Sequence, residues 1–235
     1  MKRSIYIGFD PRESAAFAIA RDTIRRHLVK PIPVHGLVQS DLRRRGLYTR
    51  RETVRHGQRW CEISEAPMST EFANSRFLVP HLAGRGLALF IDCDFMALGN
   101  IDPIFDEYDP KYAVMCVKHD HRPTDMIKMD GQTQTVYSRK NWSSCVVFNC
   151  DHPANRRLTL DMVNTLPGRD LHRFCWLEDD EIGGLDPKWN YLVGHTDKSV
   201  RPVFVHHTDG IPMMSGYEDA EYADEWWMAL EQWAE

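Results

Sequence analysis

The first forty residues alternate between apolar runs and an amphipathic segment. Residues 4–9 form a short apolar run that predicts a buried strand, and residues 32–38 predict a second one. Between them, residues 11–27 predict a helix, because small and apolar side chains recur there at helical spacing. The side chains expected on one face of this helix are Ala15, Ala16, Ile19, Ala20 and Thr23. The pattern therefore predicts a strand–helix–strand unit, the building block of parallel sheets.

The turn between the first strand and this helix carries helix-start residues. Asp10 can cap the helix, Pro11 suits its first position, and Glu13 completes a capping box three residues after Asp10. Nucleotides bind at the carboxyl ends of strands in such units. This turn is therefore a candidate nucleotide-binding loop, with Asp10 either a cap, a nucleotide contact or both.

The strongest apolar run in the first half of the chain covers residues 87–91 and stops abruptly at an acidic pair. Residues 70–82 before it have helical character, and Gly84 and Gly86 separate the two segments. The pattern predicts a buried strand that delivers Asp92 and Asp94 to its carboxyl end.

The rest of the chain predicts shorter elements of both kinds. No repeat, low-complexity tract or linker interrupts it, and 235 residues suit one α/β domain. The expected strands are 112–117, 145–148 and 203–205, and the expected helices are 155–166 and 219–233.

Composition places the chain among ordinary globular proteins, with 43% apolar and 27% charged residues. The apolar run at the N-terminus is too short for a signal-peptide core, and no apolar stretch approaches the length of a membrane helix. The six cysteines are irregularly spaced without a Cys-x-x-Cys pair, which predicts reduced thiols, most of them in the core. We therefore expect a cytoplasmic protein.

The net charge of -5 argues against a chain that binds nucleic acid over its whole surface. Residues 43–59 are nevertheless rich in arginine, with Glu52 as their only acid. This segment predicts either contact with an anionic acceptor, nucleic acid included, or a solvated loop whose charges keep it in water.

The acidic pair is the main candidate for chemistry. Asp92 and Asp94 are two residues apart, so on a strand both side chains would project from one face. Carboxylates at the end of a buried strand are costly without a partner, and a divalent cation would supply one. The other interpretation is a polar strand end at which Asp94 starts a turn.

The segment from Leu89 to Phe105 (LFIDCDFMALGNIDPIF) resembles the Asp-x-Asp segment of glycosyltransferase family 8. The resemblance implies a GT-A fold, which is an α/β, Rossmann-like mixed sheet flanked by helices in a single domain, 1–235. It also implies a nucleotide-binding half at about 1–100 and an acceptor-side half at about 101–235. Members of that family use UDP-sugars and Mn²⁺ and retain the anomeric configuration.

Three other segments are similar to this family in matching order. They are IYIGFD at residues 5–10, FANSRFLVP at residues 72–80 and VHHTDGIP at residues 205–212. By resemblance, His206 is the third metal ligand beside Asp92 and Asp94. The residues that the resemblance assigns to donor binding are Gly8, Asp10, Arg12, Arg76, Asp92, Cys93 and Gly210.

The chain also departs from the family pattern. Gly210 follows His206 by four residues instead of three, and the lysine expected before Pro212 is absent, so Arg76 or Arg12 would have to neutralise the diphosphate. The family's Asp-Gln-Asp stretch corresponds to residues 178–180. The resemblance therefore nominates Asp179 and Asp180 as catalytic residues.

Each of these residues also has a structural interpretation. His206 and His207 could be strand-end histidines bonded to backbone, Arg76 could be a surface helix residue, and residues 189–191 could be core aromatics instead of a platform for a sugar. Two carboxylates with one imidazole suit Mn²⁺ and tolerate Mg²⁺.

We therefore expect a metal-dependent glycosyltransferase that moves a sugar from a UDP-sugar to an unknown acceptor. One alternative is a nucleotidyltransferase acting on sugar phosphates, although the loop after the first strand lacks glycine. The other is a sugar-nucleotide-binding protein without turnover, which the missing lysine suggests.

Overall fold

A six-stranded mixed sheet forms the centre of the molecule in a computed structural model that describes residues 1–119, 139 and 141–234. Its strand order is β10-β8-β9-β6-β1-β2, and β9 alone runs against the others. Every residue of β6 and β9 is buried, because helices cover both faces of the sheet. The strands are β1 (Arg3–Gly8), β2 (Val34–Leu37), β6 (Leu87–Ile91), β8 (Val114–Cys116), β9 (Cys145–Asn149) and β10 (Ile182–Gly184).

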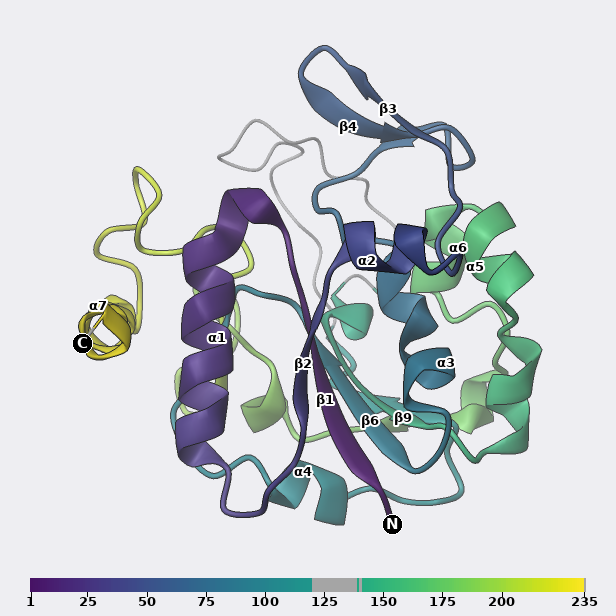
Figure 1. The fold of residues 1–235 in the computed structure, drawn as a ribbon. Helices are drawn as coiled ribbons and strands as arrows, with labels where there is room; N and C mark the ends of the chain where they lie inside the picture. The colour runs from purple at the N-terminus through teal and green to yellow at the C-terminus, as the bar shows by residue number, and fades with distance from the viewer. Residues whose placement is uncertain (120–138, 140, 235) are drawn as a thin grey trace.

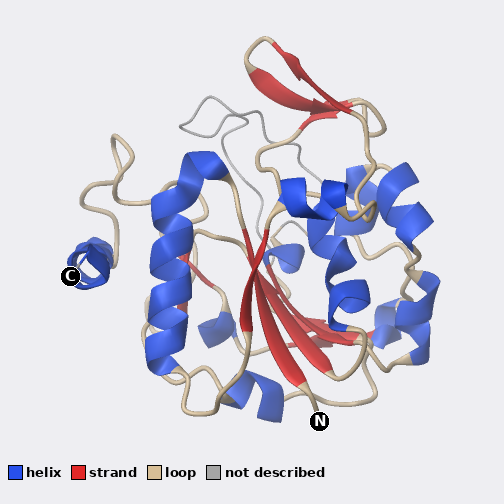
Figure 2. Cartoon of the chain, viewed as in Figure 1, coloured by secondary structure: helices blue, strands red, loops and turns tan. Residues whose placement is uncertain are grey.

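Helices lie on both sides of this sheet (Figures 1 and 2). On one side stands α1 (Ser14–His27), which buries Ile19, Ala20 and Thr23. On the other side lie α2 (Gln39–Arg44), α3 (Val79–Ala83), α5 (Leu160–Thr165) and α6 (Gly168–His172). The short α4 (Pro103–Asp106) lies below β2 in the view of Figure 1. The architecture confirms the Rossmann-like mixed sheet expected from the sequence.

A small second sheet with the order β11-β12-β7 continues the chain beyond β6. Its strands are β7 (Phe95–Ala97), β11 (Tyr191–Leu192) and β12 (Phe204–His206). Thr23 ties α1 to this sheet, because its hydroxyl accepts a hydrogen bond of 3.1 Å from the amide of Ala97. The C-terminal helix α7 (Ala223–Ala234) packs against α1 through Trp226.

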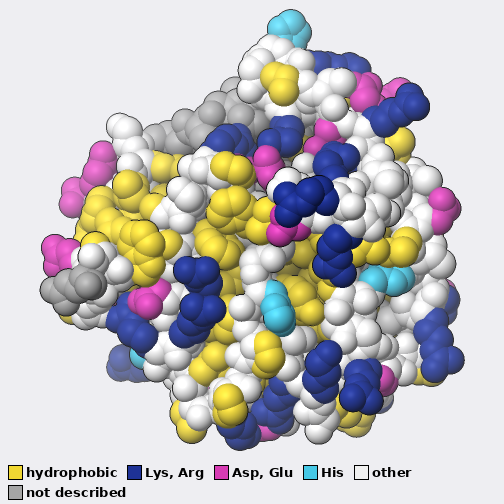
Figure 3. All heavy atoms as spheres, viewed as in Figure 1, with side chains coloured by type: hydrophobic (Ala, Val, Ile, Leu, Met, Phe, Trp, Pro, Cys, Tyr) yellow, Lys and Arg dark blue, Asp and Glu magenta, His cyan; other side chains and the backbone are white. Residues whose placement is uncertain are grey.

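The arginine-rich segment includes a hairpin, and most of its residues are exposed. It runs from α2 into a hairpin that projects from the body in Figure 1. The hairpin consists of β3 (Glu52–Arg55) and β4 (Gln58–Cys61), which β5 (Ala66–Pro67) extends. Acidic side chains lie among the basic ones near the hairpin in Figure 3. The ion pairs are Arg43–Glu52, Arg44–Asp41, Arg55–Glu62, Arg59–Glu52 and Arg59–Glu71.

Arg50 is the exception in this segment, because it is 1% exposed. Its guanidinium donates to the carbonyls of Val163 and Leu166, at 2.8 and 2.7 Å, and to Cys61 Sγ and Ser64 Oγ, at 3.0 and 3.1 Å. Arg50 therefore ties the base of the hairpin to the segment that joins α5 and α6.

Several expected helices are shorter than the sequence pattern indicates, for local reasons. Residues 70–82 form turns, the 3₁₀ helix η2 (Ser75–Leu78) and α3, in which Pro80 has no amide to donate. Residues 155–166 divide between η4 (Pro153–Arg157) and α5, because Thr159 caps α5. The helix expected over 219–233 begins only at Ala223, since Tyr222 is left-handed with φ 65°.

Four further 3₁₀ helices are η1 (Pro11–Glu13), η3 (Trp142–Ser144), η5 (Asp179–Glu181) and η6 (Pro187–Trp189). η1 occupies the first turn of the helix expected over 11–27, and Asp10 caps it by accepting from the amide of Arg12. The expected cap at Asp10 is therefore confirmed.

One hydrophobic core crosses the chain from Ile5 to Phe204, so the chain is a single domain. Four of the six cysteines are buried in it or beside it, as expected, and all six are free thiols. Among the described residues, no helix combines the length and apolar character that crossing a membrane requires.

We expect Arg50→Met to lower the free energy of unfolding by about 2 kcal/mol or more, because it leaves two buried carbonyls without their donor. Arg51→Met, at the exposed neighbouring position, should change it by no more than about 0.5 kcal/mol. Urea unfolding of both variants measures the difference. Equal stabilities would contradict a structural role for Arg50.

Candidate functional site

Asp92 and Asp94 lie where the chain passes from the large sheet to the small one. Asp92 directly follows β6, and its amide donates to the carbonyl of Ser144 at 3.0 Å. Asp94 directly precedes β7, and its carbonyl accepts from the amide of His207 at 3.0 Å. Both side chains are mostly buried, with 17% and 16% of their surface exposed.

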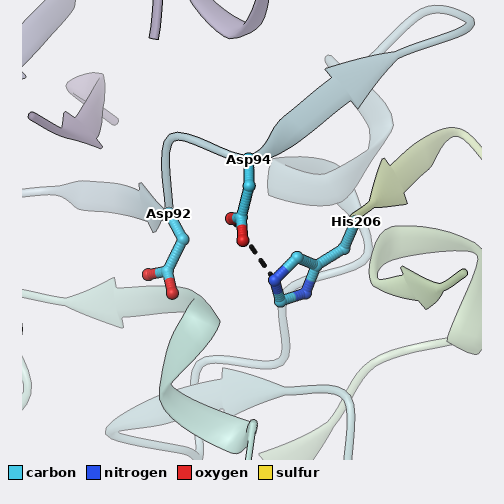
Figure 4. Close-up of side chains that lie close together, drawn as sticks. All are labelled: Asp92, Asp94 and His206. Atoms are coloured by element: carbon cyan, nitrogen blue, oxygen red, sulfur yellow. Dashed lines mark ion pairs between the residues drawn. The ribbon is translucent and has the colours of Figure 1, made fainter. Parts of the chain in front are cut away.

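His206 reaches this pair from the end of β12. It stands opposite Phe95 in the antiparallel pairing of β12 with β7, and the two rings stack with centroids 4.3 Å apart. His206 Nε2 lies 3.3 Å from Asp94 Oδ1, as Figure 4 shows. One ligand atom each from Asp92, Asp94 and His206 lies within 4.8 Å of the others. The structure therefore brings together all three residues that the sequence assigns to a metal.

The chemistry of this cluster fits a divalent cation. His206 Nδ1 is engaged at 2.9 Å by Asn190 Oδ1, which leaves Nε2 as the nitrogen available to a ligand. Two carboxylate oxygens and one imidazole nitrogen form a set of mixed hardness that suits Mn²⁺ and tolerates Mg²⁺. The arrangement can hold a divalent metal at the carboxyl end of β6.

Arg76 is a buried residue that contacts the cluster through Asp92, and not a surface helix residue. It is 6% exposed, and its Nη1 lies 2.7 Å from Asp92 Oδ1. Its guanidinium also donates to the carbonyls of Ala73 and Ser143, at 3.1 and 2.9 Å. Arg76 thus provides a permanent positive charge that compensates part of the cost of burying Asp92.

Asp10 and Arg12 form a second ion pair, at the end of β1. Asp10 is fully buried and accepts from Arg12 Nη2 at 2.8 Å and from the amide of Glu71 at 3.0 Å. Burial would raise the pKa of Asp10, but the hydrogen bonds from Arg12 outweigh it and the pKa is lowered. Arg12 also donates to the carbonyl of Ser69 at 2.5 Å. Both side chains therefore hold the loop after β1 in place.

The two glycines assigned to donor binding lie against aromatic rings. A Cβ at Gly8 would come within 2.5 Å of the ring of Phe72, and a Cβ at Gly210 within 2.6 Å of the ring of Tyr217. Close packing explains glycine at both positions, and their contact with a donor stays a prediction.

The surroundings of the Cys93 thiol argue against a role in binding a ligand. Its side chain is fully buried, and Sγ donates to Glu13 Oε2 at 2.8 Å. Burial, and then the nearby carboxylates of Glu13 and Asp94, raise the pKa of Cys93 well above its ordinary value. The thiol therefore remains protonated.

A small pocket adjoins the cluster between the start of α1 and the loop after β12. His207 in its lining is 1% exposed, and neither ring nitrogen has a hydrogen-bond partner within the described part of the chain. Burial lowers the pKa of His207 to about 4, so its ring is neutral at pH 7. The lining residues are Glu13, Asp94, His207, Thr208, Asp209, Gly210, Ile211 and Met214.

Asp179 and Asp180 lie in η5, directly before β10. β10 and β8 run parallel, and β8 has the direction of β6 because both are antiparallel to β9. The amino end of β10 therefore lies at the amino ends of the parallel strands, whereas Asp92 lies at the carboxyl end of β6. The side chain of Asp179 is 90% exposed and pairs with Arg139. The catalytic role of Asp179 and Asp180 stays a prediction.

Sequence reasoning missed the residues that support the cluster. Ser144 binds the amide of Asp92, Asn190 binds His206, and Glu13 binds Cys93. Each lies at least 16 positions from its partner, as with Asn190 and His206. No local motif marks them, because only the fold brings them to the cluster.

Comparison with other sequences gives one informative relative. No family model matches the chain. It is 44% identical over 235 residues to Protein CDI of Arabidopsis thaliana, and the match covers 97% of this chain and 86% of that protein.

Solved structures with the same fold are glycosyltransferases. The chain resembles the bifunctional glycosyltransferase WbbM (TM-score 0.61, 12% identity, 97% of this chain and 49% of that one). It resembles GlyE of Streptococcus pneumoniae TIGR4 (TM-score 0.60, 11% identity, 100% of this chain and 63% of that one). The chain thus spans about half of WbbM and under two thirds of GlyE.

A third structure matches along nearly all of both chains. It is the galactosyltransferase LgtC in complex with donor and acceptor sugar analogues (TM-score 0.59, 11% identity, 97% of this chain and 95% of that one). Identities this low show a shared fold. The chain belongs to the family of Protein CDI and has the fold of GT-A-type glycosyltransferases.

Proposed function

We propose that this protein is a metal-dependent glycosyltransferase that moves a sugar from a UDP-sugar to an acceptor, with retention of configuration. The observation that carries the proposal is the cluster of Asp92, Asp94 and His206 at the carboxyl end of β6. Ligands of open α/β sheets bind at this edge. The fold shared with glycosyltransferases supports the same conclusion.

In this proposal Asp92, Asp94 and His206 hold Mn²⁺, with Mg²⁺ as a substitute. The ion would offset the charge that develops on the departing diphosphate. Arg76 orients the carboxylate of Asp92 through its contact of 2.7 Å. Phe95 packs against the ring of His206 and excludes water from that side.

The donor would lie across the carboxyl end of β6, with its diphosphate beside Asp94 and the nucleotide toward the loop of Gly8, Asp10 and Arg12. Among the described residues, neither lysine nor arginine lines the small pocket beside Asp94, and two of its lining residues besides Asp94 are acidic. A diphosphate there depends on the metal for neutralisation, and His207 can offer it a ring N–H. A part for Asp179 or Asp180 stays a prediction from the resemblance alone.

An anionic acceptor is a further part of the proposal. Arg45 and Arg51 are exposed and make no ion pair with any described residue, whereas the other arginines of residues 43–59 are paired or buried. These two side chains are available to an anionic group.

Binding of a sugar nucleotide without turnover is the second candidate. The part of the pocket lining that the structure describes has neither lysine nor arginine, which favours this candidate, since little there besides the metal would stabilise a departing diphosphate. The two candidates differ in whether UDP is released from any donor.

Mn²⁺ should stabilise the wild-type protein against heat, by about 2.7 kcal/mol when free Mn²⁺ is 100 times its Kd. Asp94→Ala should lose this stabilisation because it removes one of three ligands. Asp161→Ala, at an exposed position in α5, should keep it. Thermal unfolding with and without Mn²⁺ makes the comparison, and an equal shift in both variants would refute the metal site.

UDP should bind at least about tenfold more tightly with Mn²⁺ than without it, a difference of about 1.4 kcal/mol. The reason is that the pocket lining has no lysine or arginine to meet the diphosphate. Calorimetric titration of wild type and Asp94→Ala measures this, and only the wild type should respond to Mn²⁺. Metal-independent UDP binding in the wild type would count against the proposal.

The reaction itself is tested by UDP release from a panel of UDP-sugars, with Asp94→Ala as the inactive control. Release that needs both Mn²⁺ and Asp94 supports transfer. Metal-dependent UDP binding without release from any donor supports the binding protein. Reaction of nucleoside triphosphates with sugar phosphates, and not of UDP-sugars, would identify a nucleotidyltransferase.

A further inference from the structure

Asn190 is a fully buried amide between η6 and β11, and its side chain contacts three polar groups. Its Oδ1 lies 2.9 Å from His206 Nδ1. Its Nδ2 lies 2.9 Å from Ser144 Oγ and 3.5 Å from the carbonyl of Asn141. A buried amide with all of these contacts has little freedom to rotate.

The neighbours of Asn190 decide which end of its amide faces His206. The hydroxyl of Ser144 donates to the carbonyl of Asn141 at 2.7 Å, so its oxygen is left to accept. Both groups near Nδ2 are therefore acceptors, and they require the NH₂ end of Asn190. In the opposite orientation the amide oxygen would face the carbonyl of Asn141, which has no proton to offer, and the hydroxyl of Ser144 could satisfy that oxygen only by giving up its own hydrogen bond to the same carbonyl.

The amide orientation in turn decides the tautomer of His206. An amide oxygen only accepts, so His206 Nδ1 must carry the proton and donate it to Asn190. The Nε2 of a neutral ring then has a lone pair, and Asp94 Oδ1 faces it at 3.3 Å. Two acceptors at this distance repel each other unless a cation lies between them, which is the arrangement that a metal ligand requires.

The turn that holds Asn190 also holds the other side of the cluster. The carbonyl of Ser144 accepts from the amide of Asp92, and the carbonyl of Ser143 accepts from Arg76, the ion-pair partner of Asp92. Asn141 begins this turn in the left-handed conformation, with φ 63°, which asparagine adopts more readily than most residues. Residues 141–144 therefore support the position of Asp92 and, through Asn190, the position of His206.

We propose that Asn190, held by the turn at residues 141–144, is a positioning residue that fixes the Nδ1–H tautomer of His206 and so presents Nε2 to the metal. The proposal rests on the proposed function for the identity of the ion. The tautomer itself is a property of the metal-free protein, which allows the two to be tested separately.

The tautomer is measured by two-bond ¹H–¹⁵N correlation spectra of the metal-free, ¹⁵N-labelled protein at a pH at which the His206 ring is neutral. The His206→Gln variant identifies the signals of this ring. We expect wild type to have protonated Nδ1 and unprotonated Nε2. A wild-type ring with the proton on Nε2 would overturn the proposal, whether or not the protein transfers a sugar.

Variants of Asn190 test the consequence for metal binding. Asn190→Leu removes the acceptor, and we expect a mixture of tautomers and a Mn²⁺ affinity about 10- to 100-fold lower by electron paramagnetic resonance. Asn190→Asp keeps an oxygen acceptor and should restore most of the affinity and the Nδ1–H tautomer. A folded Asn190→Leu variant with wild-type affinity and tautomer would refute the role.

Asn155→Leu is the matched control. Asn155 is also buried, and its amide donates to the carbonyls of Ala113 and Asn149, both at 2.8 Å, outside the cluster. Its loss should lower stability and leave Mn²⁺ affinity and the His206 tautomer unchanged. A similar loss of affinity in this control would mean that destabilisation alone explains Asn190→Leu.

The outcomes separate this proposal from the proposed function. If the wild-type protein binds Mn²⁺ with the expected tautomer and releases no UDP, the role of Asn190 is supported and the transferase activity is refuted. If Asn190→Leu does not fold, the wild-type spectrum and the Asn190→Asp variant still decide the tautomer.

Discussion

The arrangement of the site depends on the cost of placing two carboxylates at the end of a fully buried strand. β6 has no exposed residue, and Asp92 follows it directly. A carboxylate in such surroundings needs a compensating positive charge. Without one, burial favours the protonated form and the group becomes neutral. Arg76 compensates Asp92 from the protein side, whereas Asp94 Oδ1 faces His206 Nε2 at 3.3 Å, where a cation between them would supply the compensation. The cluster as a whole remains richer in acceptors than in donors, which is the condition that favours a bound cation.

Two sheets meet at this cluster, and their meeting determines its geometry. Asp92 belongs to the end of the large sheet, while Asp94 and His206 belong to paired strands of the small sheet. The turn at residues 141–144 bridges the two, because Ser144 binds Asp92 through its carbonyl and Asn190 through its hydroxyl. A rigid bridge of this kind reduces the reorganisation needed when a metal binds. The ligands are thus supported by parts of the chain that carry no ligand.

The pocket beside Asp94 differs in charge from a typical diphosphate-binding site, which is lined by basic side chains. Its lining contains acidic side chains and the neutral ring of His207, and neither lysine nor arginine contributes to it from the described ranges 1–119, 139 and 141–234. Arg76 is a positive charge in contact with the cluster, and its guanidinium is already bound to Asp92 and two carbonyls. Under the proposed function, the metal would therefore supply most of the positive charge at the donor phosphates.

The sequence by itself determined the order of the main elements and the three metal-ligand candidates. Local patterns suffice for the elements, since the strands that end before Asp92 and at His206 are visible as apolar runs, whereas the resemblance to glycosyltransferase family 8 joined His206 to the acidic pair as a candidate ligand. The cap at Asp10 is equally local. Helix boundaries at residues 70–82 and 155–166 were predicted poorly, because single residues such as Pro80 and Thr159 divide these segments.

Only the tertiary structure decided what surrounds the ligands. Arg50 and Arg76 are charged but buried, and each donates hydrogen bonds to carbonyls that are distant in the sequence. Nothing in the local sequence indicates these contacts. The contacts of Asn190 with Ser144 and His206 span 46 and 16 residues. Such pairs have no sequence signature, since hydrogen-bond partners across sheets are selected by strand order and not by spacing along the chain. The ligands could therefore be found in the sequence, while their support had to be found in the fold.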